Sequence, residues 1–254
     1  MNSAFSPLDR LDGQTTVITG GLGAIGAATA RRLAALGARI VLLHRSDAQQ
    51  AAALAASLPG TGHGAIVASV TDSQQLHAAA QAAEQTYGPA RILVNCAGFT
   101  RQVPASDLEG LDDGLIDDIF ASNWRGTFAA IRAFAPQLQA AGDSVVVNVS
   151  SIAAGTGLGS NLAYAAAKAG IDALTKGLAK TLAPHTRVLA VAPGVVDTSF
   201  VPGRDAGFNA KTGASIPLRR VGTADDVAAA IAACCTSLRY ATGSIFVADG
   251  GRHL

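Results

Sequence analysis

Short runs rich in Val, Ile and Leu alternate with longer Ala-rich stretches, and this alternation constrains the fold more than any other feature. A short continuous apolar run is typical of a strand buried on both faces, and the Ala-rich stretches have helical character. We expect strands at 15–19, 39–43, 65–68, 92–95, 144–149, 187–192 and 244–248, and helices that begin near residues 24, 48, 73, 123, 162 and 224. Because crossovers between parallel strands are right-handed, this order predicts an α/β fold with a doubly wound parallel sheet of about seven strands and helices on both faces.

The chain has 254 residues, of which 49% are hydrophobic, so it can bury one full core. No internal repeat or linker marks a second domain, and we expect residues 1–254 to form a single one. The longest irregular stretch, residues 197–216, contains Pro202, Arg204, Phe208 and Lys211. Because so long a loop in a compact domain is usually functional, we predict a lid over a substrate site.

Charge and cysteine content narrow the classes of partner. The net charge is +1 and no cluster of Lys or Arg stands out, so neither nucleic acid nor a membrane surface is expected as a partner. No apolar run reaches about 20 residues, and residues 1–13 lack the features of a secretory signal. The three cysteines, Cys96, Cys234 and Cys235, cannot make a disulfide framework. These features predict a cytoplasmic protein that acts on a small molecule or a carried acyl group.

A glycine-rich loop follows the first predicted strand, with the sequence TGGLGAIG at residues 19–26. Glycines let the backbone turn tightly and approach a pyrophosphate, whose charge the amides at a helix N-terminus stabilise. Gly21, Gly23 and Gly26 have the G-x-G-x-x-G spacing, a pattern that by itself also occurs in structural turns. Its place at the end of the first strand of a βαβ unit favours dinucleotide binding and a Rossmann-like sheet.

The end of the second predicted strand bears on the choice of cofactor. His44 and Arg45 stand where an acidic residue would hold the adenosine ribose of NAD(H). An arginine can instead hold a 2′-phosphate through a charge-assisted contact, which favours NADP(H). If Arg45 is simply a solvated surface residue, either cofactor can bind.

Tyr164 and Lys168 lie four residues apart on a predicted helix, so their side chains share one face. A phenol has an ordinary pKa near 10 and is a poor acid or base at neutral pH. An adjacent ammonium lowers that pKa because it stabilises the phenolate. The pair is therefore a candidate proton-transfer group.

With these motifs in hand, the sequence resembles the short-chain dehydrogenase/reductase family in its single-domain form. The resemblance covers nearly the whole chain. It rests on the glycine-rich loop, Asn95-Cys96-Ala97-Gly98, Asn123, Val149-Ser150-Ser151, Tyr164-Ala-Ala-Ala-Lys168, Pro193-Gly194 leading to Thr198, and Asp249-Gly250-Gly251.

The resemblance implies an NAD(P)-dependent oxidoreductase with four catalytic residues. Tyr164 would exchange the proton, Lys168 would tune it and hold the nicotinamide ribose, Ser151 would polarise the substrate oxygen, and Asn123 would hold a water next to Lys168. Purely structural roles are the alternative for two of these residues: Ser151 could cap a turn, and Asn123 could be the N-cap of the helix through Trp124. Ser150 is the alternative to Ser151 as the substrate contact.

The resemblance also implies a cofactor site and no metal. The residues implied are Gly20, Gly21, Gly23, Ala24, Ile25, Gly26, His44, Arg45, Ser69, Val70, Asn95, Ala97, Gly98, Tyr164, Lys168, Pro193, Gly194, Val196 and Thr198. Two positions depart from the family pattern. Ala24 replaces a glycine and is expected to crowd the turn slightly, and Ser69 replaces an aspartate that contacts the adenine.

The substrate is less constrained. Ile216-Pro217-Leu218 through Asp226 and the segment 242–251 resemble the 3-oxoacyl-[acyl-carrier-protein] reductase group. Arg132, Lys176 and Lys180 could then receive an acidic carrier protein, although a solvated helix face explains them equally well. Sugar, polyol or other alcohol dehydrogenases of the same family are the alternative.

Two further hypotheses carry less support. A non-catalytic dinucleotide-binding regulator does not need the Tyr164–Lys168 pair. The spacing of Gly20, Gly23 and Gly26 resembles sugar-nucleotide epimerases, but we expect no C-terminal substrate domain here. The resemblance implies a homotetramer or homodimer, and the small residues at 123–140 and 163–182 would suit packing between subunits or within one.

Overall fold

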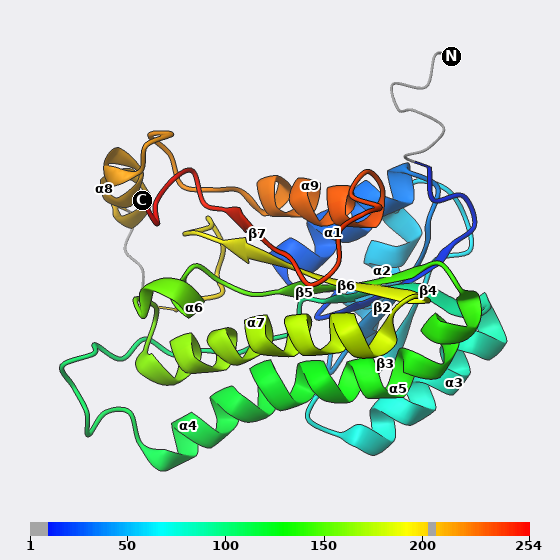
Figure 1. The fold of residues 1–254 in the computed structure, drawn as a ribbon, viewed down its shortest axis with the longest axis horizontal. Coiled ribbons are helices and arrows are strands. Elements are labelled where there is room, and N and C mark those ends of the chain that lie inside the picture. Colours follow the sequence, from blue (N-terminus) through cyan, green and yellow to red (C-terminus); the bar gives the residue numbers. More distant parts are fainter. Residues whose placement is uncertain (1–9, 203–206) are drawn as a thin grey trace.

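The computed structural model describes residues 10–202 and 207–254, and its centre is one parallel sheet of seven strands in the order β3-β2-β1-β4-β5-β6-β7 (Figure 1). The strands are β1 (Thr15–Thr19), β2 (Arg39–His44), β3 (Gly64–Val67), β4 (Ala90–Asn95), β5 (Ser144–Val149), β6 (Thr186–Pro193) and β7 (Ile245–Ala248). All seven predicted strands are present, and their ends differ from the prediction by at most two residues. The predicted Rossmann-like, doubly wound sheet is confirmed.

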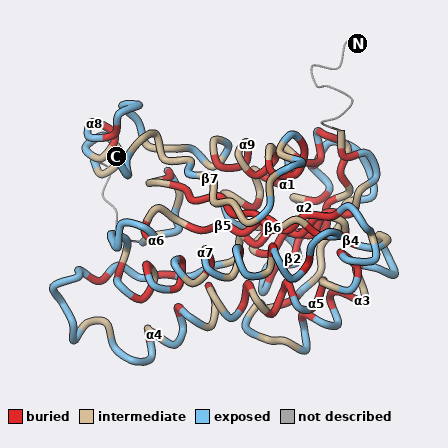
Figure 2. The backbone as a smooth tube through the Cα atoms, in the orientation of Figure 1, coloured by how far each residue is buried: buried red, intermediate tan, exposed pale blue. Residues whose placement is uncertain are grey.

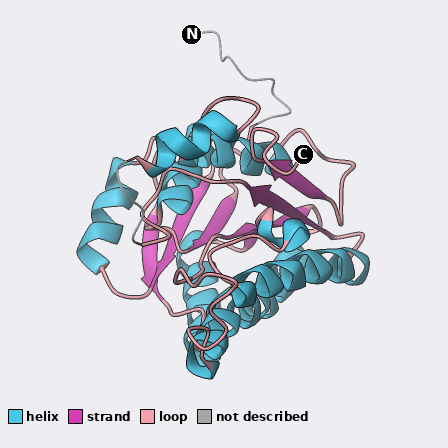
Figure 3. Cartoon of the chain, turned by 90° about the vertical axis from the view of Figure 1, so that its left-hand side faces the viewer, coloured by secondary structure: helices cyan, strands magenta, loops and turns pink. Residues whose placement is uncertain are grey.

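Helices cover both faces of the sheet (Figure 3). They are α1 (Ala24–Ala35), α2 (Ala48–Ser57), α3 (Ser73–Tyr87), α4 (Asp113–Phe120), α5 (Gly126–Ala141), α6 (Ala153–Thr156), α7 (Leu162–Leu182), α8 (Phe208–Ser215) and α9 (Ala224–Cys235), with a π-helical turn, η2 (Ala121–Arg125), between α4 and α5. Within the described residues, no helix is both long enough and apolar enough to cross a membrane.

The core has two halves because successive side chains of a strand point to opposite faces. In β1, Ile18 packs with α1 and α9, whereas Val17 packs with α3, α5 and the end of α7. Both side chains are completely buried, and Figure 2 shows the same burial along the central strands. This two-sided burial explains why the strands read as continuous apolar runs in the sequence.

Side-chain caps fix where several helices begin, because they satisfy amides that have no partner within the helix. Asp47 accepts a hydrogen bond from the amide of Gln50 at the start of α2, and Asp72 does the same for two amides of α3. Asn161 caps α7 through the amide of Tyr164, 2.7 Å away. Thr223 and Asp226 form a reciprocal capping box at α9.

One predicted helix start is wrong. Asn123 does not open a helix: the helical chain begins ten residues earlier at Asp113, where Asp112 is the N-cap, and runs through η2 into α5. The aspartates and Gly114 make this segment look like a loop, yet Leu115 and Ile119 bury one apolar stripe against Ala163 and Ala167 of α7. Helix α8 likewise lies inside the stretch expected to be irregular.

Phe134 of α5 is completely buried against α3 and the sheet, which yields a test of the packing. Phe134→Ala should lower the free energy of unfolding by about 3–5 kcal/mol, because it removes a large apolar side chain and leaves a cavity. Urea denaturation of both proteins measures this. Phe120→Ala is the control, since Phe120 is 37% exposed, and equal losses in the two variants would contradict the assigned core.

Candidate functional site

The carboxyl ends of β1, β4, β5 and β6 open into a cavity of about 780 Å³. Its walls come from the glycine-rich loop, the segment after β5, the start of α7, and the segment 193–201 together with α8. Ligands of doubly wound sheets bind at this edge. Of the residues predicted from the sequence, the cavity is lined by Gly20, Gly23, Ala24, Ile25, Gly26, Gly98, Ser151, Tyr164, Lys168, Pro193, Gly194, Val196 and Thr198.

The glycine-rich loop brings the N-terminus of α1 to the cavity wall. Gly20 has φ +63°, and a Cβ there would lie 2.8 Å from the backbone of Ala97. A Cβ on Gly26 would collide with the carbonyl oxygen of Gly20, so α1 begins against the loop only because this residue is glycine. The first amides of α1 have no acceptor within the helix, and this cradle fits a dinucleotide pyrophosphate.

Two expectations about this loop need correction or limits. The methyl group of Ala24 does not crowd the turn, because Ala24 is exposed and lines the cavity. Gly21 is buried, and a Cβ there would lie 2.8 Å from the side chain of Leu42. Gly21 therefore serves the packing of the loop on β2.

The remaining predicted cofactor residues lie outside the cavity wall. His44 is the last residue of β2 and Arg45 follows it, and Ser69 and Val70 follow β3. His44 is buried, and its Nδ1 has no hydrogen-bond partner among the described residues, whereas Arg45 is exposed. Ala97 is fixed by a hydrogen bond from its amide to Thr19.

Asn95 does not reach the cavity wall either. It is buried, and its Nδ2 donates to Oδ1 of Asn148 on the neighbouring strand β5 at 2.9 Å. Asn148 in turn donates to the hydroxyl of Thr175 on α7. This chain of side chains ties β4, β5 and α7 together beneath the site.

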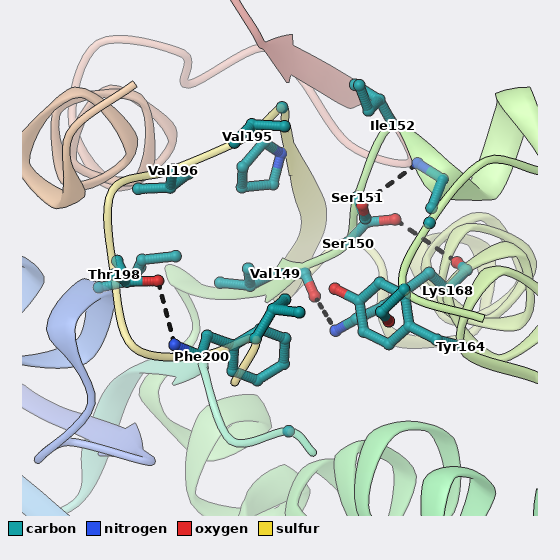
Figure 4. A pocket seen from close by; sticks show the side chains of 18 of the residues that line it. Val149, Ser150, Ser151, Ile152, Tyr164, Lys168, Val195, Val196, Thr198 and Phe200 are labelled. Carbon is teal, nitrogen blue, oxygen red and sulfur yellow. Dashed lines mark hydrogen bonds between the residues drawn. The ribbon is translucent and has the colours of Figure 1, made fainter. Parts of the chain in front are cut away.

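Tyr164 and Lys168 stand side by side on the first turns of α7 (Figure 4). The Lys168 Nζ lies 5.6 Å from the centre of the Tyr164 ring and donates to the carbonyl oxygen of Val149 at 2.8 Å. The cap made by Asn161 fixes the backbone of Tyr164. The spacing in the sequence thus places a phenol and an ammonium together in one cavity.

Burial controls the charge of Lys168. It lowers the pKa of this ammonium to about 8, while the neighbouring Cys96 and Asp172 act in the opposite direction. Burial also raises the pKa of the Cys96 thiol to about 12, so this thiol is protonated at neutral pH. Burial raises the pKa of Asp172, against the effects of its hydrogen bond with Ser150 and of Lys176 and Lys168.

The two serines after β5 are used differently. Ser150 is buried, and its hydroxyl donates to Oδ1 of Asp172 on α7 at 2.5 Å. It borders the cavity, but its proton is already used in this hydrogen bond. Ser151 is partly exposed and lines the cavity, and its Oγ accepts the amide of Ala153 at 3.1 Å. Ser151 therefore caps the turn and keeps its own proton to donate.

Asn123 lies completely buried inside the π-helical turn. Its Nδ2 donates to the carbonyl oxygens of Phe99 and Ile119, and its Oδ1 has no hydrogen-bond partner among the described residues. A Cβ on Gly98 would lie 2.7 Å from that Oδ1. The N-cap hypothesis is wrong, because the π turn instead directs Asn123 toward the loop after β4.

Sequence reasoning missed several residues at or below the cavity. Asp172 could have been found, because it lies one helical turn after Lys168 on the same face of α7. Gln102, Leu158 and Arg252 line the cavity but lie far apart in the sequence. No local pattern marks them, since only the tertiary fold brings them to one place.

Comparisons with known proteins agree with this geometry. Residues 21–253 match the family model described as Enoyl-(Acyl carrier protein) reductase. The chain is 35% identical to cis-4-hydroxycyclohexanecarboxylate dehydrogenase of Sinomonas cyclohexanicum, covering 94% of this chain and 96% of that protein. It is 32% identical to the 3-oxoacyl-[acyl-carrier-protein] reductase of Thermotoga maritima, covering 95% and 98%.

A solved structure is similar to this chain over nearly its whole length. A short-chain glucose/ribitol dehydrogenase from Brucella melitensis superposes with a TM-score of 0.88 at 29% identity, covering 96% of this chain and 98% of that one. The chain belongs to the short-chain dehydrogenase/reductase family. It is an NAD(P)-dependent oxidoreductase that transfers a hydride between a nicotinamide and a carbonyl or alcohol group.

Burial of Lys168 predicts a trade between stability and activity. Its pKa falls from 10.5 to about 8. Burying the charged ammonium therefore lowers the free energy of unfolding, and Lys168→Met removes this destabilisation. Allowing for the lost hydrogen bond to Val149, we expect the cofactor-free variant to be about 2 kcal/mol more stable at pH 7 and inactive.

The pH dependence distinguishes this cause from a packing effect. Below pH 8 both folded and unfolded wild type keep the ammonium, so the advantage of the variant is complete. As the pH rises from 8 toward 10.5, the folded protein loses this proton first and the advantage should shrink. Urea denaturation of both proteins across this range measures it, and a constant difference would contradict the assignment.

Proposed function

We propose that the chain reduces ketones to secondary alcohols with NADPH, that Tyr164 is its proton donor, and that 3-oxoacyl thioesters are its substrate class. The observation that supports this most is the placement of Tyr164 and Lys168 in the same cavity that the glycine-rich cradle lines. One cavity can thus hold a dinucleotide and a second molecule next to a proton-transfer group.

The proposed mechanism assigns each polar side chain one role. The bound nicotinamide supplies the hydride. Ser151 donates a hydrogen bond to the carbonyl oxygen, which orients it toward Tyr164, and Tyr164 gives its proton to the oxygen as negative charge develops there. The ammonium of Lys168 lowers the cost of the phenolate that remains. Alcohol oxidation reverses these steps.

Asn123 acts beneath this group in the proposal. Its buried Oδ1 faces the loop at Gly98 and has no hydrogen-bond partner among the described residues, so a water can bind there. Such a water would connect Lys168 to solvent and restore the proton that Tyr164 gives away.

Residues 197–216 form the proposed lid, of which residues 203–206, including Arg204, lie outside the described residues. Thr198, Phe200, Val201 and Phe208 line the cavity, and the Phe200 ring centre lies 6.1 Å from that of Tyr164. An aromatic wall this close to the phenol would exclude water and strengthen the hydrogen bonds to the substrate oxygen.

The proposal of NADPH rests on Arg45. It follows β2, is exposed, and can pair with a 2′-phosphate in a bidentate contact. The neighbouring Nδ1 of His44, buried and without a hydrogen-bond partner among the described residues, offers a further polar atom at the strand end.

Two substrate classes compete for the cavity. Leu158, Phe200 and Phe208 give an apolar wall suited to an acyl chain, the substrate class in the name of the 3-oxoacyl reductase relative. The hydroxyls of Thr156, Ser160 and Ser199 favour a sugar or polyol, the substrate class in the name of the glucose/ribitol dehydrogenase. A substrate panel of acyl thioesters, simple ketones and polyols separates them, and faster turnover of polyols would overturn the thioester assignment.

We further propose a cytoplasmic homotetramer or homodimer. The edge strand β7 leaves Val247 exposed, and Tyr240 before it is fully exposed. Pairing with a second copy is one way to cover such an edge. Arg132, Lys176 and Lys180 are proposed to receive an acyl carrier protein if the substrate is carried.

Tyr164→Phe tests the catalytic assignment. The variant keeps the ring and loses the proton, so kcat should fall at least about 10³-fold while the Kd for NADPH stays within about twofold. Steady-state kinetics and fluorescence titration measure the two quantities. Substantial remaining turnover would contradict the role of the phenol. Tyr87→Phe, at the end of α3 and outside the cavity lining, is the matched control.

Arg45→Asp tests the cofactor assignment. A carboxylate at this position repels a 2′-phosphate and can accept ribose hydroxyls, so preference should move from NADPH toward NADH by about 100-fold or more in kcat/KM. The ratio of kcat/KM for the two cofactors is measured in wild type and variant. An unchanged ratio would show that Arg45 does not contact the cofactor.

A further inference from the structure

Arg252 is a charged residue at the cavity that the proposed mechanism does not use. It lines the cavity together with Phe208 and Ser215 of α8, although it lies near the C-terminal end. Among the described residues in the wall, only Lys168 and Arg252 are charged, and neither is acidic. Lys168 is buried, donates to the carbonyl oxygen of Val149 and is assigned to the cofactor, so Arg252 is the exposed cation left for a second molecule.

A specific turn after β7 brings Arg252 to this place. Gly250 and Gly251 have φ angles of +69° and +88°, and Cβ atoms on them would press against Ile216 and Pro217 at the end of α8. The amide of Leu218 donates to the carbonyl oxygen of Gly250. The C-terminal end therefore lies beside α8 (Figure 1), and Arg252 lines the cavity there.

The buried carboxylate of Asp249 fixes this turn. It is 3% exposed and accepts hydrogen bonds from the amides of Gly251 and His253 and from His253 Nδ1, each between 2.8 and 2.9 Å. Burial raises the pKa of Asp249, but these hydrogen bonds outweigh it and the pKa lies below its usual value. The carboxylate oxygens of Asp249 are thus bound within the turn, and Asp249 makes no ion pair with Arg252.

The guanidinium of Arg252 has no hydrogen-bond or ion-pair partner in the described ranges 10–202 and 207–254. Some other arginines are paired within the described residues, for example Arg220 with Asp226 and Arg32 with Asp225, but none of these lines the cavity. An unpaired guanidinium on the wall of a cavity with no acidic residue among its described lining favours a ligand that carries an oxyanion.

The topology separates Arg252 from the proposed phosphate contacts of the cofactor. Those contacts lie at the start of α1 and after β2, whereas Arg252 follows β7 at the opposite edge of the sheet. Tyr164 lies on α7, which packs against β6, the neighbour of β7. Arg252 is thus on the side of the cavity where the second molecule, not the adenosine, would lie.

We propose that Arg252 binds an anionic group of the substrate, so that the enzyme prefers ketones or secondary alcohols that also carry a carboxylate or a phosphate. This deepens the proposed function and rests on it. The carbonyl lies between Ser151 and Tyr164, the anion lies against Arg252, and the apolar residues contact the part in between. The anion is either a carboxylate of the substrate itself or a phosphate of the handle to which an acyl group is attached.

Two matched substrate pairs test the proposal. One is 4-oxocyclohexanecarboxylate and its methyl ester, and the other is acetoacetyl-CoA and the neutral N-acetylcysteamine thioester of acetoacetate. For Arg252→Gln, the ratio of kcat/KM for the charged over the neutral member should fall about five- to tenfold in one pair, through KM. The pair that responds identifies the source of the anion. Arg252→Lys should lose less, and Arg31→Gln, an exposed arginine on α1 away from the cavity, should match wild type.

The readouts separate the possible failures. A ketone that is not turned over is compared by its Kd for the NADPH complex, measured by calorimetry. Unchanged ratios in both pairs, or no binding of either charged probe, would overturn the role of Arg252. If the affinity for NADPH falls in Arg252→Gln by as much as the charged-over-neutral ratio does, the arginine belongs to the cofactor site instead. If wild type binds neither NADPH nor NADH, the proposed function itself fails, and this inference fails with it.

Discussion

The site depends on one unfavourable burial, that of the Lys168 ammonium at the carboxyl end of the sheet. The carbonyl oxygen of Val149 compensates for part of the lost hydration, and Asp172 supplies a partly buried opposite charge one turn along α7. Ser150 orients Asp172, and the side chains of Asn95, Asn148 and Thr175 join the two central strands to the same helix. Much of the polar structure beneath the cavity thus holds one cation next to one phenol.

The rest of the fold brings other chemistry to that cation. Because all seven strands are parallel, their carboxyl ends lie at one edge, and loops from both halves of the chain meet there. The glycine cradle comes from the segment after β1, the hydroxyl of Ser151 from the segment after β5, and the aromatic wall from the segment after β6. A single cavity can therefore combine a cofactor cradle, a proton donor and a substrate wall.

The sequence predicted those parts of the structure that follow from local rules. The strands were found because burial on both faces leaves continuous apolar runs, and the starts of α2, α3 and α9 agree with side-chain caps at Asp47, Asp72 and Thr223. The start at Asn123 was wrong because a π turn continues the helix there, and α4 was missed because its aspartates hide a narrow apolar stripe. The Tyr164–Lys168 pair followed from helix periodicity. The place of Arg252 did not, since it depends on a turn at the far end of the chain that packs on α8.

The central claim is that the phenol of Tyr164 and the ammonium of Lys168 face the reactive end of a bound nicotinamide. A crystal structure with NADPH bound tests this most directly. The account predicts the pyrophosphate at the N-terminus of α1, the nicotinamide ribose within hydrogen-bond distance of Lys168, and the Tyr164 hydroxyl beside the nicotinamide ring. A ring bound elsewhere, or a Tyr164 hydroxyl turned away from it, would contradict the account.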